Sequence, residues 1–305
     1  MEGKLIRGVA GFFYVRTETG TVWQCKAKGT FRREGIRPLA GDNVSFEVTH
    51  EADKEGNIES IHPRKNELLR PPVVNIDQAL LVFACAAPAV NHHLLGRFLV
   101  MMRQKELPLL LCFNKRDLDE AQAASLLQDY AGSGCSLHAI SVAEDRGIRE
   151  LAAELKGKTS VVAGPSGVGK SSLINALCAE AGMETGDVSR KTGHGRNTTR
   201  HSELFALSEA YACGVPSYLC DTPGFMSLKT ENTDARDLHL WIPEFEPYAD
   251  KCRYDNCTHL TEPDCAVKEA LSEGKIARLR YEDYRLLYEE LRGERPVYVK
   301  KAKKG

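Results

Sequence analysis

A glycine-rich loop in the middle of the chain is the segment best suited to chemistry. Residues 164–171 fit the pattern G-x-x-x-x-G-K-[ST], which wraps the phosphates of a nucleoside triphosphate. Its glycines let backbone N–H groups converge on the phosphate oxygens, and the N-terminus of the following helix adds partial positive charge. In this interpretation Lys170 reaches the β- and γ-phosphates and also serves catalysis, while Ser171 holds Mg²⁺. The predicted contact residues are Gly164, Pro165, Ser166, Gly167, Val168, Gly169, Lys170, Ser171 and Ser172.

A second nucleotide motif precedes this loop. The apolar run Leu109–Phe113 leads into Asn114, Lys115, Arg116 and Asp117, and a strand ending in N-K-x-D is typical of guanine-reading sites. The aspartate would accept hydrogen bonds from N1–H and the 2-amino group of guanine, whereas adenine would leave a buried carboxylate unpaired. The lysine stem can cover the base, and the asparagine can tie neighbouring loops together. A charged surface loop is the weaker interpretation because a phosphate loop is predicted in the same domain.

Three shorter motifs fit the same chemistry. Ser141, with the backbone at Val142 and the next residue, resembles the S-A-K motif that supports guanine O6 through backbone N–H groups. Asp221 and Gly224 fit D-x-x-G, in which the aspartate orients the Mg²⁺ shell and the glycine N–H touches the γ-phosphate. A threonine pair between these motifs can supply the second Mg²⁺ ligand and act in catalysis. Its members are Thr198 and Thr199.

A cysteine- and histidine-containing stretch near the C-terminus predicts a metal site. Cys252, Cys257, His259 and Cys265 follow the spacing C-x4-C-x-H-x5-C. Three thiolates and an imidazole suit tetrahedral Zn²⁺, and four protein ligands leave no open position. Buried structural cysteines are the alternative, but the charged and polar neighbours of these residues disfavour it. We therefore expect one structural zinc ion.

Composition places the chain among ordinary globular proteins. It has 305 residues, of which 42% are hydrophobic and 27% charged, with a net charge of −1. Such a balance gives no global attraction for nucleic acid, so any RNA-binding surface must be a local patch. The N-terminus lacks an apolar signal-peptide core, and the longest apolar run, Ala79–Val90, is too short to span a bilayer. We expect a cytoplasmic monomer without a membrane partner and without disulfides among its ten cysteines.

Three regions must position these groups. Residues 1–68 show short alternating segments typical of a small β-barrel of the oligonucleotide-binding (OB) type, with basic and aromatic residues interleaved. Whether those aromatics contact RNA or form the core is left open by the sequence. Residues 69–232 alternate strands and helices, which predicts an α/β domain with a parallel sheet. Residues 233–305 combine the zinc cluster with a helical region, Ala266–Gly293, and a basic tail.

The nucleotide motifs occur in an unusual order. Base recognition at 114–117 and 141–143 precedes the phosphate loop, the threonine pair and D-x-x-G. A circular permutation explains this order without disrupting the site, because domain termini often lie close together and a fold depends on adjacency in space. The middle region is thus predicted to be a circularly permuted P-loop GTPase domain.

The whole chain closely resembles the RsgA (YjeQ) family of small ribosomal subunit biogenesis GTPases. Besides the motifs above, Arg37-Pro-Leu-Ala-Gly-Asp42 in the predicted barrel matches the family. The resemblance implies an OB-fold N-terminal domain, one bound Zn²⁺, and hydrolysis of GTP to GDP stimulated by the small (30S) ribosomal subunit. It also implies late maturation of that subunit and contact with 16S rRNA.

One position departs from the family. Its switch segment usually carries a histidine proposed to be catalytic, and this chain has Asn197 there. An amide can orient water by hydrogen bonding but cannot accept a proton at neutral pH. We therefore expect slow intrinsic hydrolysis, with Asn197 as the weakest catalytic assignment. A GTP-switched rRNA-binding module with negligible turnover is the alternative, and an ATPase or nucleoside kinase is opposed by Asp117.

Overall fold

The computed structural model describes residues 1–33, 35–69, 72–183, 202–221 and 234–293. The chain divides into two compact units. One unit holds Met1–Val90, Leu107–Leu127 and Ser136–Leu228, and the other holds Asn91–Glu106, Gln128–Cys135 and Lys229–Gly305. The predicted switch residues Asn197, Thr198, Thr199 and Gly224 lie outside the described residues.

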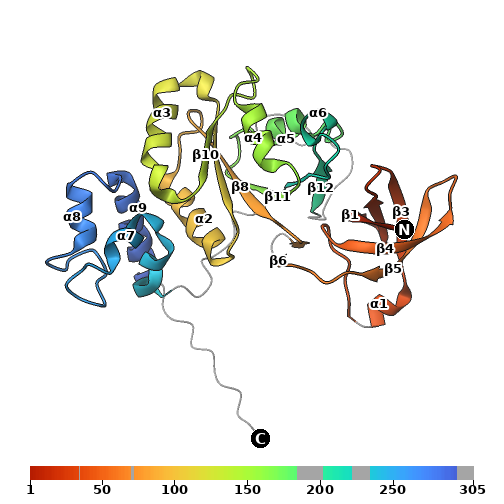
Figure 1. Cartoon of the computed structure of the whole chain (residues 1–305), viewed down its shortest axis with the longest axis horizontal. Helices are drawn as coiled ribbons and strands as arrows, with labels where there is room; N and C mark the ends of the chain where they lie inside the picture. The colour runs from red at the N-terminus through yellow and green to blue at the C-terminus, as the bar shows by residue number, and fades with distance from the viewer. Residues whose placement is uncertain (34, 70–71, 184–201, 222–233, 294–305) are drawn as a thin grey trace, which may run out of the picture. The chain divides into compact units, whose positions relative to one another are not determined.

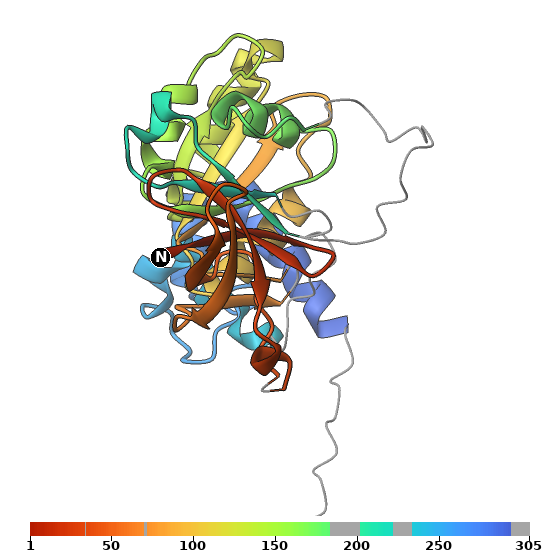
Figure 2. The same ribbon diagram turned by 90° about the vertical axis from the view of Figure 1, so that its right-hand side faces the viewer.

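The N-terminal region is a closed five-stranded barrel, as predicted (Figures 1 and 2). Its strands are β1 (Glu2–Val9), β2 (Phe12–Arg16), β3 (Val22–Ala27), β4 (Asn43–His50) and β5 (Glu55–Ile61). They close in the order β1-β2-β3-β5-β4, with β3 and β5 parallel and the other neighbours antiparallel. Closure leaves no open sheet edge. A short helix that the sequence did not predict, α1 (Gly29–Arg33), follows β3.

The barrel aromatics differ in how deeply they are buried. Trp23 is buried in the barrel core, with its ring 5.7 Å from that of Phe46. Phe12 and Tyr14 are only half-buried, and cations lie over their rings: Lys26 is 5.5 Å from the first centroid and Arg7 is 4.4 Å from the second. The indole of Trp23 is therefore part of the core, whereas the rings of Phe12 and Tyr14 on β2 are partly exposed and lie next to positive charges.

The second part of the Arg37–Asp42 motif, residues 39–42, forms a buried joint, whereas Arg37 is exposed. Asp42 is fully buried and accepts hydrogen bonds from the Leu39 amide at 2.7 Å and from Arg64 Nε at 2.8 Å. Arg64 also donates to the Arg37 carbonyl at 2.7 Å. Next to this joint the chain forms a two-stranded ribbon of β6 (Glu67–Leu69) and β7 (Pro72–Val74). The carboxylate thus satisfies backbone and guanidinium groups that burial would otherwise leave unpaired.

The central sheet has six strands in the order β10-β9-β8-β11-β13-β12. They are β8 (Gln78–Ala84), β9 (Leu109–Asn114), β10 (Ser136–Ala139), β11 (Thr159–Ala163), β12 (Glu203–Ala206) and β13 (Tyr218–Asp221). All neighbours are parallel except β12 and β13. The chain builds outward from β8 through β9 to β10, then returns to β11 and builds the other side. Because the direction reverses between β8 and β11, a ligand site is expected beyond the carboxyl ends of these strands.

The helices of this unit cover the sheet with apolar faces. They are α3 (Glu120–Asp129), α4 (Ile148–Leu155), α5 (Lys170–Leu177) and α6 (Glu209–Ala212). Inward residues of α4, α5 and α6 join sheet residues in one buried cluster, including Leu151 of α4, Leu173 of α5 and Leu219 of β13. Helix α5 ends at Leu177, and β10 ends at Ala139, so both the phosphate loop and the loop after β10 adjoin short elements.

The second unit is helical and contains the zinc-type cluster. It includes α2 (His92–Gln104), α7 (Glu246–Ala249), α8 (Ala266–Ser272) and α9 (Arg278–Gly293), and its 3-10 turns are η2 (Ala131–Ser133), η4 (Ala235–Trp241) and η5 (Pro243–Phe245). Among the described residues of the first unit, η1 (Arg116–Leu118) is a further 3-10 turn. The single helical region predicted over Ala266–Gly293 is two helices, because Gly274 adopts φ +74 after α8.

A buried ion cluster and two surface pairs hold the second unit together. Arg280 is 1% exposed and donates to Glu244 at 2.6 Å, with its guanidinium 5.2 Å from the Tyr130 ring centroid. On α2, His93 and Arg97 each contact the Glu290 carboxylate at 2.8 Å. Burial of paired charges favours one packing arrangement over others. Among the described residues, no helix has the length and apolar character needed to cross a membrane.

Candidate nucleotide-binding site and metal centre

The phosphate loop connects β11 to α5 as the sequence predicts. Strand β11 is buried along its length, and α5 begins at Lys170. Gly164 has φ +148 and lies so close to the Val82 carbonyl of β8 that a Cβ would overlap it. Gly169 has φ +94, and a Cβ there would overlap the side-chain amide of Asn114. Glycine is required at both positions, because other residues disfavour this backbone region and no space exists for a side chain.

The loop lysine is directed into the loop. Lys170 Nζ donates to the Pro165 carbonyl at 2.6 Å. Burial lowers the pKa of Lys170, and the nearby Asp221 carboxylate at the end of β13 opposes that shift. Ser171 and Ser172 occupy the first turn of α5, half-buried. A cation held at the start of a helix, opposite a carboxylate, suits a ligand that carries negative charge and a divalent ion.

The guanine-type motif is tied to the phosphate loop by Asn114. This residue ends β9 and is 2% exposed. Its Nδ2 donates to the Val168 carbonyl at 2.9 Å, and its Oδ1 accepts from the Val142 amide at 3.2 Å. One buried amide therefore joins three segments predicted from separate motifs. The Val142 N–H, expected from the sequence to face a base, is engaged in this bond.

Lys115 adds a second tie between the same loops. It adopts φ 62, and its Nζ donates to the carbonyls of Gly167 at 2.8 Å and Ala87 at 2.5 Å. The contact with Ala87 was not foreseen from the sequence, because it joins the loop after β8 to residues 28 positions away. No sequence signal marks residue 87, since a backbone carbonyl is common to all residues.

Asp117 offers an acceptor where the base is expected. It lies in η1, directly after β9, and its Oδ1 is buried with no hydrogen-bond partner among the described residues. A buried oxygen without a hydrogen-bond partner destabilises the folded protein, and groups of this kind often mark ligand positions. The nearby Ser141 pairs with Arg146 through both backbone hydrogen bonds, at 3.0 Å each, which shapes the loop after β10.

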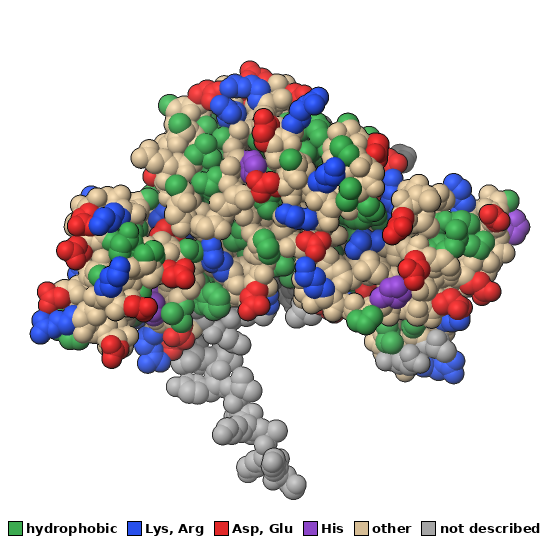
Figure 3. All heavy atoms as spheres, in the orientation of Figure 1, with side chains coloured by type: hydrophobic (Ala, Val, Ile, Leu, Met, Phe, Trp, Pro, Cys, Tyr) green, Lys and Arg blue, Asp and Glu red, His purple; other side chains and the backbone are tan. Residues whose placement is uncertain are grey.

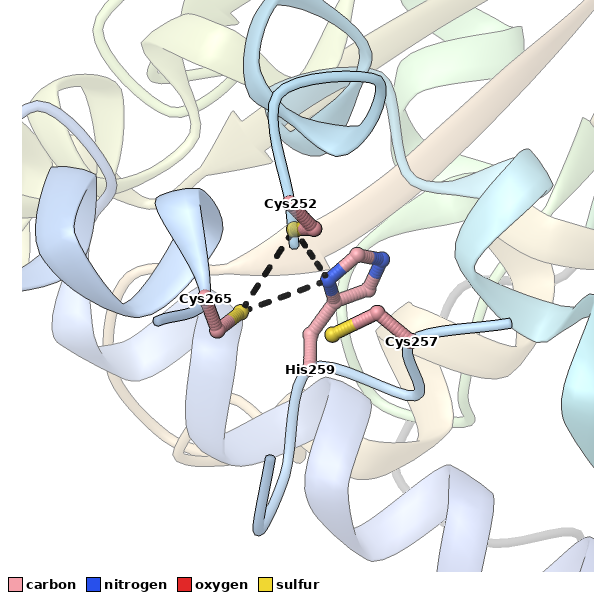
Figure 4. A group of neighbouring side chains, drawn as sticks. All are labelled: Cys252, Cys257, His259 and Cys265. Carbon is pink, nitrogen blue, oxygen red and sulfur yellow. Dashed lines mark hydrogen bonds between the residues drawn. The ribbon is translucent and has the colours of Figure 1, made fainter. Parts of the chain in front are cut away.

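The four metal-type residues converge in the second unit (Figure 4). Their ligand atoms all lie within 4.8 Å of one another. His259 Nδ1 is 3.5 Å from the sulfurs of Cys252 and Cys265, which are 3.8 Å apart. For a tetrahedral ion with Zn–S of about 2.3 Å and Zn–N of about 2.05 Å, these separations would be about 3.6 Å and about 3.8 Å. The donor set and its dimensions fit Zn²⁺.

Burial favours the neutral forms of the side chains in this cluster when no cation is bound. Burial raises the pKa of the Cys257 thiol to about 12 and lowers the pKa of His259 to about 4. A thiolate is therefore unfavourable in this setting unless a cation compensates it. The neutral imidazole that burial favours is the form that coordinates metals.

Residues outside the predicted ligand set shape the metal loop. Glu262 accepts from the Thr258 amide at 2.9 Å and from its hydroxyl at 2.6 Å, and also from the Leu260 amide at 3.1 Å. Although burial opposes it, these hydrogen bonds lower the pKa of Glu262 to about 2. Tyr281 of α9 donates to the His259 carbonyl at 2.7 Å. The position of Glu262 between two ligands was a usable sequence signal, whereas Tyr281 is 22 residues away.

Comparisons with known proteins agree with this architecture. The RsgA GTPase family model matches residues 61–231, and the RsgA N-terminal domain model matches residues 2–58. This chain belongs to the RsgA family. A relative from Agathobacter rectalis, named small ribosomal subunit biogenesis GTPase RsgA, is 48% identical over 96% of this chain and 98% of its own length. A second RsgA of that name, from Geobacillus sp. strain WCH70, is 40% identical over 97% and 99%.

Two solved RsgA-type structures share the fold. YjeQ from Thermotoga maritima has a TM-score of 0.78 and 33% identity, covering 96% of this chain and 99% of its own. YloQ, described as a circularly permuted GTPase, has a TM-score of 0.73 and 32% identity, with coverage of 97% and 96%. The predicted fold class is therefore confirmed: an N-terminal barrel, a permuted GTPase domain and a C-terminal region with a Cys/His cluster. The permuted motif order follows from the family rather than from chance matches.

Proposed function

We propose that this protein is a GTPase of small ribosomal subunit biogenesis, which binds the 30S subunit and hydrolyses GTP to GDP and phosphate. The observation that carries the proposal is the position of Asn114, whose side chain joins the guanine-type loop to both the phosphate loop and the loop after β10. Three motifs that are weak separately are thereby parts of one site. The names of the relatives support the ribosomal part of the proposal.

Each site residue has a proposed role. Asp117 accepts hydrogen bonds from the guanine edge, with Lys115 and Arg116 beside it and Ser141 and Val142 in the adjoining loop. The phosphate loop, residues 164–172, binds the phosphates through its N–H groups and Lys170. Mg²⁺ is assigned to Ser171, to Thr199 or Thr198, and to Asp221 through its water shell. Gly224 and the catalytic candidate Asn197 complete the set.

We further propose that three regions of the chain have separate functions. Residues 1–68 contact 16S rRNA through the half-buried rings and cations of the barrel, which suit stacking on unpaired bases. Residues 69–232 bind and hydrolyse GTP, and residues 233–305 hold one structural Zn²⁺. The protein acts as a cytoplasmic monomer, with a local basic patch compensating for its near-neutral net charge.

The deciding experiment measures GTP turnover by the full chain with and without 30S subunits. Stimulation of turnover by 30S is the expected result. If 30S binds but turnover stays negligible over many protein equivalents, the rRNA-binding alternative is correct. The same assay on Asn197→Ala tests the catalytic assignment, because equal rates for variant and wild type would exclude a role for Asn197.

Base selectivity is tested separately with Asp117→Asn. Asparagine presents an amide donor where aspartate presents an acceptor. The variant should therefore bind GDP more weakly and xanthosine diphosphate more tightly, because the 2-oxo group of xanthine is an acceptor. A loss of about tenfold to hundredfold in GDP affinity is expected from the unpaired buried group. Unchanged GDP binding would show that Asp117 does not read the base.

A further inference from the structure

The carboxylate of Glu120 bridges two arginines from different loops. Glu120 is the first residue of α3, and its Oε2 accepts from Arg116 Nη2 at 2.9 Å and Nε at 3.2 Å. Its Oε1 contacts Arg146 Nη1 at 2.7 Å. Arg116 belongs to the N-K-R-D loop, and Arg146 belongs to the loop after β10. One side chain therefore joins the two loops assigned to the guanine base.

Both arginines are also anchored to the backbone of those loops. Arg116 donates through Nη1 to the Ala139 carbonyl at 3.2 Å and through its amide to the Ile140 carbonyl at 3.0 Å. Arg146 exchanges two backbone hydrogen bonds with Ser141, at 3.0 Å each, and its guanidinium contacts Glu144 at 3.1 Å. A shift of the Glu120 carboxylate would therefore move backbone in both loops.

The two loops held by this bridge are the ones that the sequence predicts to line the guanine base. Asp117 directly follows Arg116, and its Oδ1 is buried without a partner among the described residues. Val142 directly follows Ser141, and its amide contacts Asn114. Hydrogen bonds weaken steeply with misalignment, so selectivity depends on holding such groups within about 0.5 Å of their working positions.

The charge of the bridge is stable near neutral pH. Hydrogen bonds from Arg116, then from Arg146, lower the pKa of Glu120, so the carboxylate stays ionised. Figure 3 shows acidic and basic side chains intermixed at the end of the molecule where α3 begins. The side chains of Glu120 and Arg146 are 50% and 45% exposed. Exposed ion pairs contribute little to folding stability, so a role in loop geometry is the stronger explanation for this shared carboxylate.

We propose that Glu120, together with Arg116 and Arg146, is a positioning clamp that aligns the two base-reading loops and so sets the preference for guanine. The inference rests on the proposed GTP-binding function and deepens it. Glu120 touches no nucleotide atom in this scheme. It acts through the loop backbone, and its effect should be largest for a base that carries the 2-amino group, because such a base offers Asp117 one more hydrogen bond.

The test compares GDP with inosine diphosphate, which lacks the 2-amino group. Dissociation constants for both are measured by calorimetry on the full chain and on Glu120→Gln, which keeps the size but not the charge. GDP affinity should fall by about twofold to fivefold, as exposed ion pairs allow, with a smaller loss for inosine diphosphate. The ratio of the two constants should move toward one, and the loss should shrink at high salt because screening already weakens the wild-type bridge.

Two comparisons separate positioning from general damage. Arg149→Gln and Glu150→Gln, on the exposed face of α4, should leave the ratio unchanged. The loss of GDP binding free energy in the double variant Glu120→Gln/Arg146→Gln should be smaller than the sum of the losses in the two single variants. The reason is that each single variant already removes the Glu120–Arg146 contact. Thermal unfolding of the nucleotide-free proteins should match wild type.

The possible failures are distinguishable. If wild type binds GDP and prefers it to inosine diphosphate, but Glu120→Gln keeps the same ratio, the clamp is wrong and the GTP site stands. If wild type shows no preference for GDP over ADP, the proposed function itself fails. Equal proportional losses for both diphosphates would assign Glu120 to general nucleotide affinity and would overturn the positioning role.

Discussion

Asn114 Nδ2 donates to the Val168 carbonyl oxygen at 2.9 Å and so ties the end of β9 to the phosphate loop, 54 positions later in the sequence. The same side chain accepts from the Val142 amide at 3.2 Å. A buried amide that satisfies two loops at once fixes their separation. Among the contacts of the described residues that join these loops, the Asn114 side chain is the one that reaches both the phosphate loop and the loop after β10.

Replacing Asn114 by alanine should weaken nucleotide binding strongly. The substitution leaves a buried carbonyl and an amide without partners, at about 1–3 kcal/mol for each unsatisfied group. We expect GDP affinity to fall by about tenfold to hundredfold in calorimetry. Asn66 is a matched control, because its side chain also makes two bonds, to the carbonyl and amide of Ile76 at 2.7 and 2.8 Å. Asn66→Ala should lower thermal stability with GDP affinity retained, and similar affinity losses for both variants would contradict the assignment.

Gly169→Ala should abolish nucleotide binding while Gly214→Ala should not. Both glycines have positive φ, +94 and +76, so alanine carries a similar backbone cost of about 1–2 kcal/mol at each. At Gly169 the new Cβ also overlaps the Asn114 side chain, whereas nothing lies within 4 Å at Gly214. Fluorescence titration with a labelled guanine nucleotide, alongside thermal unfolding, separates the two effects. Normal binding by Gly169→Ala would show that the loop tolerates rearrangement.

Cys257→Ser should remove the metal and destabilise the second unit. Cys257 is 5% exposed and its ligand atom belongs to the four-residue cluster, while Cys213 is exposed and lies in the other unit. We expect one zinc per chain in wild type and in Cys213→Ser, and well under one in Cys257→Ser, by elemental analysis. A structural zinc site contributes folding free energy directly, so the melting temperature should fall with the metal content. Full zinc content in Cys257→Ser would exclude this residue as a ligand.

Asp283 should make stability depend on pH. It is 4% exposed beside Arg280, and burial raises its pKa to about 6, while Arg280 and His93 oppose the shift. The Asp283 carboxyl keeps its proton to higher pH in the folded state than in the unfolded state. Its contribution to the free energy of unfolding is therefore fully present below about pH 4 and is lost as the pH rises through about 6. The difference in free energy of unfolding between Asp283→Asn and wild type should therefore be about 1–2 kcal/mol more favourable to the variant at pH 7.5 than at pH 4.

The measurement for Asp283 is denaturant unfolding followed at both pH values. Zinc content is checked at each pH, because loss of metal would also change stability. Glu290→Gln offers a comparison, since Glu290 is a partly exposed carboxylate on the same helix, paired with His93 and Arg97. A pH profile of Asp283→Asn parallel to that of wild type would refute the raised pKa.

The sequence predicted more of the chemistry than of the packing. The phosphate loop, Asp117 and the four zinc-type ligands were found because each chemistry requires fixed residue types at short spacing. The barrel was predicted from alternation, yet α1 and the break between α8 and α9 were missed, because a short helix or a local turn leaves little periodicity. Which of the barrel aromatics belong to the core was decided by burial, which depends on how β2 and β3 face the core, while contact of the other rings with RNA stays a prediction.

The residues that support the sites were the least visible in sequence. Tyr281 of α9 donates to the backbone of His259 in the metal loop, and Glu120 at the start of α3 contacts Arg146 in the loop after β10. Helix α2 follows β8 in the chain, yet it belongs to the unit that holds the zinc-type cluster. Such pairings arise from topology, and no local pattern encodes them.

The sequence by itself determined which groups are predicted to bind guanine, phosphate and zinc, because side-chain chemistry and short-range spacing are set by the order of residues. Only the tertiary structure decided which distant groups hold them in place. Asn114 and Val168, or Glu120 and Arg146, meet because parallel strands bring their carboxyl-terminal loops to one edge of a sheet. That adjacency survives a permuted chain order, since a binding site requires its atoms to be close in space and not consecutive in sequence.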